Sequence, residues 1–233
     1  MRISFWTRLL DLISPRLCMV CGERLTVTEQ DVCTLCYMHL PRTDFQMQPT
    51  DNPMARMFWG LIPVERATAL FYYEAASGPS QIVYELKYHN HPEVGVTMGR
   101  MLARELQVGG FFDGIDALVP IPLAKRRQRQ RGYNQSLMLA QGISQATGIA
   151  IYNKVVRRKA FTESQTKLYR WERQENVKDI FELTDADAIA GKHLLIIDDV
   201  VTTGATTTAC ARELLKAPGV TISILSLAFT KTT

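Results

Sequence analysis

Residues 194–208 combine residue types that are suited to binding a phosphorylated sugar. An apolar run of strand-forming residues ends in two adjacent carboxylates, Asp198 and Asp199, and a turn of small and hydroxyl-bearing residues comes next. From Ala209 onward the residues suit a helix, so the order is strand, turn and helix. Ligands of open α/β sheets bind at the carboxyl ends of strands, and N–H groups at the start of a helix attract anions. The pattern predicts a phosphate site in the turn at 202–207.

The paired carboxylates indicate what binds beside the phosphate. Two negative charges next to a phosphate repel it unless they face sugar hydroxyls or a cation. We therefore expect ribose hydroxyls at Asp198 and Asp199 and a 5′-phosphate in the turn, where Gly204 lets the backbone approach the ligand. The alternative is an ordinary buried strand that ends in a polar turn. Closely spaced threonines together with both carboxylates favour the ligand site.

Two CxxC pairs, Cys18/Cys21 and Cys33/Cys36, form a second pattern with clear chemistry. Each pair can present two thiolates from a tight turn, and together they complete a tetrahedral zinc site with four cysteine ligands. A segment this short has no core of its own, so bound metal would supply its folding energy. The alternatives are a redox role for one pair and a poorly occupied site. The fifth cysteine, Cys210, is expected to be a small buried residue.

Positive charge is concentrated between residues 123 and 178, where thirteen Lys and Arg stand against three Glu. The densest run, residues 125–131, comes after an expected strand in a segment that we expect to be a loop. This run predicts a second anion site, with a solvated basic loop as the alternative. Residues 154–181 are also polar and charged. They fit either a flap that closes over a charged ligand or an exposed connection.

The apolar periodicity indicates the elements that must position these residues. Strands are expected at 67–73, 115–119, 194–197 and 220–229, and helices at 80–88, at 94–107, up to about 147 and up to about 216. Strands that alternate with helices predict an α/β fold with a parallel, doubly wound sheet. Residues 41–66 contain several prolines and little periodicity, and are expected to be a linker.

Length and composition fit one globular domain with a small appendage. The chain has 233 residues, of which 46% are hydrophobic and 21% charged. No apolar run is long enough for a transmembrane helix, and the N-terminus is not a convincing signal peptide, so we expect a cytoplasmic protein. Residues 4–13 have the spacing of a short amphipathic helix that packs onto the neighbouring segment. A role at a membrane surface is the weaker alternative.

Residues 196–206 resemble the phosphoribosyl-pyrophosphate (PRPP) signature of type I phosphoribosyltransferases. Nearly the whole chain resembles the ComF/GntX family, in which a four-cysteine zinc module precedes a type I phosphoribosyltransferase domain. Besides the cysteine pairs, the resemblance rests on Leu86-Lys87-Tyr88, Val119-Pro120-Ile121-Pro122 and Arg131-Gly132-Tyr133-Asn134-Gln135. It implies an N-terminal helix and zinc module at 1–45, a linker at 46–66 and, at 67–233, a parallel sheet flanked by helices.

The resemblance also implies a role for each candidate residue. Asp198 and Asp199 would be the catalytic pair that binds the ribose hydroxyls of PRPP, and Mg²⁺ would be held largely by the ligand. The remaining candidates divide by the part of the ligand that they would contact. They are Thr202, Thr203, Gly204, Ala205 and Thr206 for the 5′-phosphate, Lys125, Arg126, Arg127 and Arg131 for the pyrophosphate, and Arg158, Gln165 and Arg173 in the flap.

Two functions are compatible with these residues. The first is binding of PRPP or a nucleotide, with transfer of phosphoribose to an acceptor that no segment identifies. The resemblance links the family to natural competence and the use of external DNA, and so to competence proteins as partners. The second is a non-catalytic DNA-handling factor that binds single-stranded DNA through the zinc module and the basic stretch. Tyr133, Tyr169 and Trp171 could then stack on bases, although we favour core or flap positions for them.

Overall fold

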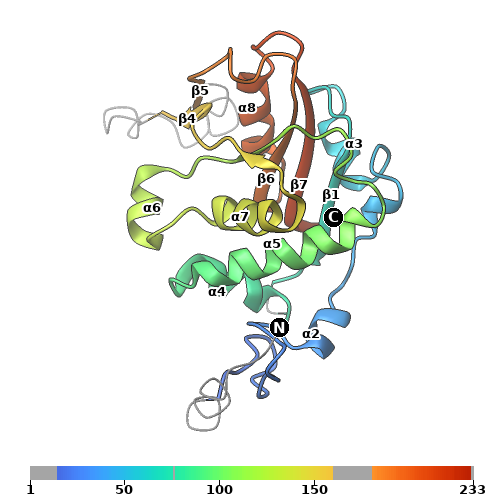
Figure 1. Ribbon diagram of the computed structural model, residues 1–233, viewed down its shortest axis with the longest axis vertical. Coiled ribbons are helices and arrows are strands. Elements are labelled where there is room, and N and C mark those ends of the chain that lie inside the picture. The colour runs from blue at the N-terminus through green and yellow to red at the C-terminus, as the bar shows by residue number, and fades with distance from the viewer. Residues whose placement is uncertain (1–14, 76, 160–179, 232–233) are drawn as a thin grey trace.

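The computed structural model describes residues 15–75, 77–159 and 180–231. Its centre is a five-stranded sheet in which all neighbouring strands are parallel (Figure 1). In spatial order the strands are β1 (Ala67–Tyr73), β7 (Thr221–Thr230), β6 (His193–Val201), β2 (Ala117–Pro120) and β3 (Ala150–Ile151). This sheet confirms the predicted fold class, a parallel sheet flanked by helices.

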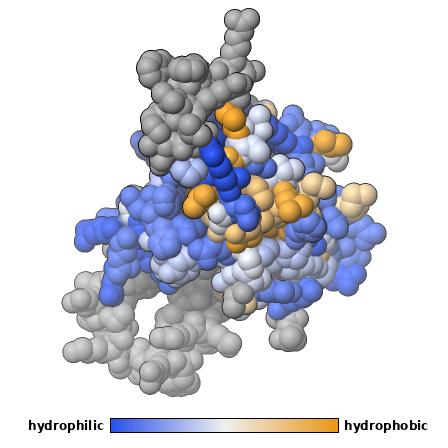
Figure 2. All heavy atoms as spheres, turned by 90° about the horizontal axis from the view of Figure 1, so that it is seen from below, coloured by the Kyte–Doolittle hydropathy of each residue, from blue (hydrophilic) through white to orange (hydrophobic). Residues whose placement is uncertain are grey.

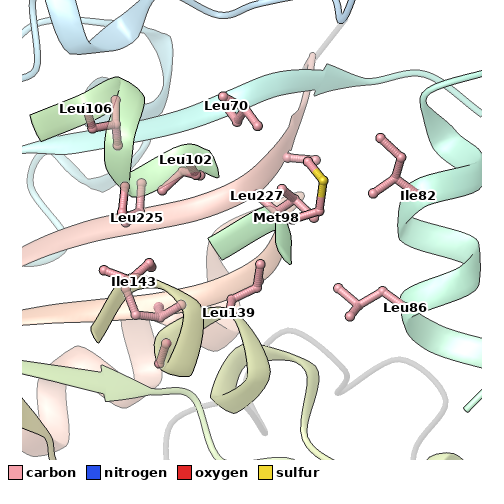
Figure 3. Packing of buried hydrophobic residues seen from close by; sticks show 14 of the residues in the cluster. Leu70, Ile82, Leu86, Met98, Leu102, Leu106, Leu139, Ile143, Leu225 and Leu227 are labelled. Atoms are coloured by element: carbon pink, nitrogen blue, oxygen red, sulfur yellow. The ribbon is translucent and has the colours of Figure 1, made fainter. Parts of the chain in front are cut away.

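Helices cover both faces of the sheet. On one face lie α4 (Ser80–Tyr88), α5 (Pro92–Gln107) and α7 (Gln135–Thr147), and on the other α3 (Pro53–Phe58) and α8 (Ala205–Leu214). Successive side chains of a strand point to opposite faces, so Leu195 joins the first hydrophobic cluster and Ile196 the second. Figure 3 shows the first cluster, where side chains from α4, α5 and α7 meet those from β1 and β7.

The chain changes direction across the sheet between the neighbouring strands β2 and β6. β2 leads through α6 (Lys125–Arg131) and α7 to the edge strand β3, whereas β6 leads through α8 to β7 on the other side. A small antiparallel pair, β4 (Val156–Arg158) with β5 (Phe181–Leu183), contacts α8. The carboxyl ends of β2 and β6 therefore form a topological switch point, where open α/β sheets bind ligands.

The basic run at 125–131 differs from the expected loop, because it forms the short helix α6. Arg, Gln and Lys are good helix formers, and the run contains no glycine or proline. Gly132 then ends the helix in a left-handed conformation, with φ of 78° and its N–H bonded to the carbonyl of Gln128. The basic side chains consequently project around a helix instead of lying along an extended loop.

Residues 41–66 also differ from the expected linker. They contain a 3₁₀ turn, η1 (Phe45–Met47), and the helix α3. The Asn52 side chain caps α3 by accepting hydrogen bonds from the N–H groups of Met54 and Ala55 at 3.0 Å. Phe45, Met54 and Phe58 are buried in the second hydrophobic cluster. Burial of these large side chains joins the segment to the folded core despite its weak periodicity.

The cysteine-containing segment packs against the helical layer of the sheet through α5. It contains α2 (Thr34–Met38), and its buried Cys18, Leu25 and Val32 belong to the same hydrophobic cluster as α4, α5 and α7. Glu105 of α5 accepts hydrogen bonds from Tyr37 at 2.8 Å and from Arg42 at 2.6 Å. Apolar packing and this charged contact together hold the segment on α5.

The expected helix at 4–13 lies outside the described residues. Within the described ranges, no helix combines the length and apolar character needed to cross a membrane.

Candidate functional site

A cleft opens at the carboxyl ends of β2 and β6, between α4, α6 and the start of α8. Its volume is about 230 Å³. Pro122 and Leu123 after β2 form one wall, and Asp198, Asp199 and Val200 of β6 form the floor. Most other side chains that line it are polar or basic: Lys87, Arg127, Arg131, Asn134, Gln135, Ser136, Arg158, Thr202 and Thr206. Several predicted ligand-binding residues therefore meet at the switch point. They are Asp198, Asp199, Thr202 and Thr206 at the end of β6 and in the turn that follows it, Arg127 and Arg131 of α6, and Arg158 of the expected flap.

Strand geometry directs the two carboxylates to different partners. Asp198 has the same orientation as Ile196 and meets α8, where Thr207 Oγ1 donates a hydrogen bond to Asp198 Oδ2 at 3.2 Å. Asp199 points to the other face and meets α4, where Lys87 Nζ lies 3.3 Å from Asp199 Oδ2. The pair therefore spans the strand end, with one carboxylate toward each helical layer.

Asp198 is a buried carboxylate with few hydrogen-bond donors. Its side chain accepts from Thr207 and from the N–H of Asp199, the latter at 2.9 Å. Burial, reinforced by the negative charge of Asp199, raises the pKa of Asp198 well above its usual range. A carboxylate held at this energetic cost in a cleft is typical of a functional site.

We expect Asp198→Asn to stabilise the fold. A carboxyl group with a raised folded-state pKa contributes full stability only at low pH and loses it as the pH rises toward that pKa. The amide cannot ionise, so the melting temperature of the variant should exceed that of the native chain at pH 8, with a smaller difference at pH 5. Asp199→Asn is the comparison variant: it removes the charge that repels Asp198 but also the partner of Lys87, so its gain at pH 8 should be smaller. Equal melting temperatures for the native chain and Asp198→Asn at pH 8 would contradict the proposed cost of the buried charge.

The turn between β6 and α8 forms a small hollow next to the cleft. It has a volume of about 40 Å³ and is lined by residues 198 and 200–207, mostly through threonine side chains and backbone. Gly204 is the N-cap of α8 and has φ of 69°, a conformation that suits glycine. The hollow at the N-terminus of α8 combines hydroxyl donors and helix N–H groups, which suits a phosphate.

The basic candidates are only partly brought together. Arg127, Arg131 and Arg158 line the cleft, whereas Lys125 and Arg126 do not. Burial and the nearby charge of Arg127 lower the pKa of Arg158. Among the described residues, neither Arg127 nor Arg158 forms an ion pair. These positive charges gather on one side of a cleft whose floor carries Asp198 and Asp199, and they favour an anionic ligand on that side.

Two of the expected flap residues, Gln165 and Arg173, lie outside the described residues, as do Tyr169 and Trp171. Tyr133 is described and is buried, with its hydroxyl donating to the carbonyl of Leu86 at 2.7 Å. It is a core residue and cannot stack on a base, in agreement with the preferred expectation.

The sequence interpretation assigned no role to Lys87, Asn134, Gln135 or Ser136, which all line the cleft. Lys87 belongs to the motif Leu86-Lys87-Tyr88, but its helix is far from the carboxylates in sequence. Only the packing of α4 therefore reveals its contact with Asp199. Asn134 could have been noticed as a helix cap: its side chain accepts from the N–H of Ser136 at 3.1 Å and donates to the carbonyl of Ile121. These bonds connect the segment after β2 to the start of α7.

The four paired cysteines come together away from the cleft. The sulfur atoms of Cys18, Cys21, Cys33 and Cys36 all lie within 4.8 Å of one another, and the Sγ atoms of Cys21 and Cys33 are 3.9 Å apart. A tetrahedral zinc site with Zn–S bonds of about 2.3 Å requires S···S separations of about 3.8 Å. Burial opposes ionisation of Cys18, but backbone N–H groups more than offset it and lower its pKa to about 7. The donor set fits zinc.

The structure also places the fifth cysteine and three of the histidines. Cys210 is buried in α8, and His39 is exposed, with its ring bonded to the carbonyl of Leu35. His89 and His91 are exposed, and their Nδ1 atoms lie 2.6 Å and 2.8 Å from carboxylate oxygens of Glu85 and Glu93, respectively.

Comparison with known proteins gives relatives along most of the chain, although no protein-family model matches it. The DNA utilization protein YhgH of Salmonella typhimurium is 28% identical over 226 residues, which cover 93% of this chain and 98% of the relative. Competence protein F of Haemophilus influenzae is 30% identical over 59% of this chain and 62% of its own. Competence protein ComFC of Bacillus subtilis is 36% identical over 42% of this chain and 38% of its own.

Solved structures share only a distant likeness. Glutamine PRPP amidotransferase from B. subtilis has 20% sequence identity and a TM-score of 0.41, covering 60% of this chain and 30% of its own. Adenine phosphoribosyltransferase from Thermoanaerobacter pseudethanolicus has 17% identity and a TM-score of 0.38, covering 64% of this chain and 84% of its own. Scores this low assign neither a ligand nor a reaction to this chain.

Proposed function

The chain belongs to the ComF family, and from this premise we propose that it binds PRPP, together with Mg²⁺, in the cleft at the carboxyl ends of β2 and β6. The observation that carries the proposal is the arrangement at the end of β6. Two carboxylates stand directly before a threonine-rich turn whose hollow opens at the N-terminus of α8. A sugar that carries a 5′-phosphate matches both halves of this arrangement.

Each part of the ligand has a complementary group. The 5′-phosphate would lie in the turn from Thr202 to Thr206, and the ribose hydroxyls would donate to Asp198 and Asp199. The pyrophosphate would lie on the basic side of the cleft, near Arg127 and Arg131. Oxygen ligands suit Mg²⁺, and most of them would come from the ligand, with the two carboxylates as the acidic groups that line the cleft.

Lys87 has a place in this proposal. Its ammonium group pairs with Asp199, and it lines the same cleft as Arg127 and Arg131. When PRPP binds, Lys87 can turn toward a phosphate oxygen and leave Asp199 to the ribose hydroxyls. The side chain of Lys is long and flexible enough for such an exchange of partners.

If transfer follows binding, the bond from C1 of the ribose to pyrophosphate breaks and an acceptor bonds to C1. The chain would act by positioning the sugar and by stabilising the negative charge that develops on the departing pyrophosphate. None of the residues that line the cleft specifies the acceptor. The reaction would take place in the cytoplasm, where PRPP would be available.

Isothermal titration of PRPP with Mg²⁺ tests the proposal. We expect micromolar binding to the native chain and a loss of at least about tenfold with Asp199→Asn, because the variant loses a charged acceptor for the ribose hydroxyls. Ribose 5-phosphate should show the same loss, since it presents the same hydroxyls. Arg129→Ala is a suitable control, because Arg129 lies on α6 but does not line the cleft.

Absence of PRPP binding to the correctly folded native chain would overturn the proposal. The second candidate, a DNA-handling factor, would then lead, since the names of several relatives refer to DNA utilization. That function predicts binding of single-stranded DNA that weakens steeply as salt rises and does not respond to Asp199→Asn.

A further inference from the structure

A second hollow adjoins the cleft on the outer side of α4 and α6. It is open, has a volume of about 510 Å³, and is lined by Lys87, Tyr88, Arg127, Gln130 and Arg131. Three of these residues, Lys87, Arg127 and Arg131, also line the first cleft, so the two spaces share a basic wall. The volume falls within the range of about 300–1,000 Å³ that is typical of small-molecule sites.

Two exposed aromatic rings lie at this end of α4. Tyr88, which lines the hollow, is 63% exposed, and Tyr84, one helical turn earlier, is 47% exposed. Their ring centres are 5.0 Å apart, and the ring of His89 lies edge-on to Tyr84 at the same distance. The buried face of α4 is made by other residues, including Ile82 and Leu86, so packing of the core does not account for the outward-facing rings.

The aromatic and basic groups are held against each other. The guanidinium carbon of Arg131 lies 5.7 Å from the ring centre of Tyr88, and Arg131 also donates to Gln135 Oε1 at 2.9 Å. The first contact is a cation–π interaction, and the second holds the guanidinium beside the ring. Five of the seven residues of α6 are basic. In Figure 2, the left side of the face seen from below is strongly hydrophilic, on the same side as α6 in Figure 1.

We propose that this hollow is a second binding site, which takes a nucleotide by stacking its base on Tyr88 and holding its phosphate with Arg127 and Arg131. An exposed ring next to cationic side chains matches a flat aromatic base joined to an anion, whereas phosphate alone would leave the ring unused. The site goes beyond the proposed PRPP site and does not require PRPP. The nucleotide can be a free mononucleotide or one unit of a single strand.

Titrations with adenosine 5′-monophosphate and ribose 5-phosphate test the role of the base, because the two ligands share the sugar phosphate. Base stacking predicts that the mononucleotide binds about 5- to 100-fold more tightly. Tyr88→Ala should abolish this difference, and Tyr88→Phe should retain it because the ring remains. The exposed position of Tyr88 allows both variants to fold, which their melting temperatures would verify.

A 5′-phosphorylated adenine oligonucleotide distinguishes the two sources of the nucleotide. A nucleic-acid strand should stack on both rings, so Tyr84→Ala should weaken oligonucleotide binding as Tyr88→Ala does. Binding of a free mononucleotide should depend on Tyr88 alone. Either result supports the site. Equal affinity for the mononucleotide and ribose 5-phosphate, or a base-dependent gain that survives Tyr88→Ala, would overturn it. Because Arg127 and Arg131 line both spaces, Asp199→Asn distinguishes the two sites: it should weaken PRPP binding and leave mononucleotide binding unchanged, since Asp199 does not line the second hollow.

Discussion

Replacing Cys18 and Cys33 together with serine is expected to release zinc, unfold residues 16–40 and lower the melting temperature of the remaining domain. Structural zinc sites contribute about 10–16 kcal/mol to the folding of small modules, so this segment should not fold without metal. Because Cys18, Leu25 and Val32 belong to the cluster that includes α4 and α5, the loss should also expose apolar surface of the sheet domain. The sheet domain should remain folded but become less stable.

Three measurements check this result. Metal analysis gives the zinc content, thermal unfolding gives the loss of stability, and amide hydrogen exchange shows whether α5 becomes less protected. Cys210→Ala is the matched control, since Cys210 is a cysteine of α8 outside the cluster of four sulfur atoms. Zinc retained in full by the double variant would refute the four-cysteine site. Unchanged exchange in α5 would refute the shared core.

Gly204→Ala should greatly reduce phosphate binding at the turn before α8. Two effects combine: φ at this position is 69°, and an added Cβ would lie 2.8 Å from Met57 Sδ and 2.9 Å from Phe58 Cε1. The Met57 side chain is flexible enough to move, but Phe58 is fully buried and cannot be displaced without a large cost in free energy. The turn must therefore shift, and with it the threonine and N–H groups that would hold the phosphate.

Gly148→Ala separates the steric effect from the backbone strain. Gly148 has φ of 78° and ends α7, but an added Cβ would meet no atom within 4 Å. This control should cost about 1–2 kcal/mol for the left-handed backbone alone. Gly204→Ala should lower the unfolding free energy more than Gly148→Ala does. It should also weaken PRPP binding, measured by calorimetry, by about 100-fold or more, whereas Gly148→Ala should leave that binding unchanged. Equal effects of the two substitutions would show that contact with α3 does not shape the turn.

The helix α3, which contacts this turn, lies in residues 41–66, where the sequence pattern predicts a linker. A six-residue helix is too short for clear periodicity, and its proline is typical of both linkers and first helical turns. The apolar residues of α3 can be recognised as core residues only once the sheet face that they cover is known. The basic run at 125–131 is ambiguous for a related reason: its charge pattern suits a loop and a helix equally well, and only Gly132 indicates where a helix would end.

The sequence by itself determined the features that depend on local spacing. The strand, turn and helix around Asp198 and Asp199, the two CxxC pairs and the alternation of strands and helices all lie within short stretches, where residue type and period carry the information. The parallel sheet and the convergence of four cysteines follow from these patterns.

Only the tertiary structure decided which distant groups meet. Strand alternation sends Asp198 toward Thr207 and Asp199 toward Lys87, and that second contact depends on how α4 packs on the sheet. The same packing brings Tyr88 beside Arg131, a residue of a different helix much later in the chain. Such pairs leave no periodic signal, because the distance between them is set by how the elements that carry them pack in the folded chain.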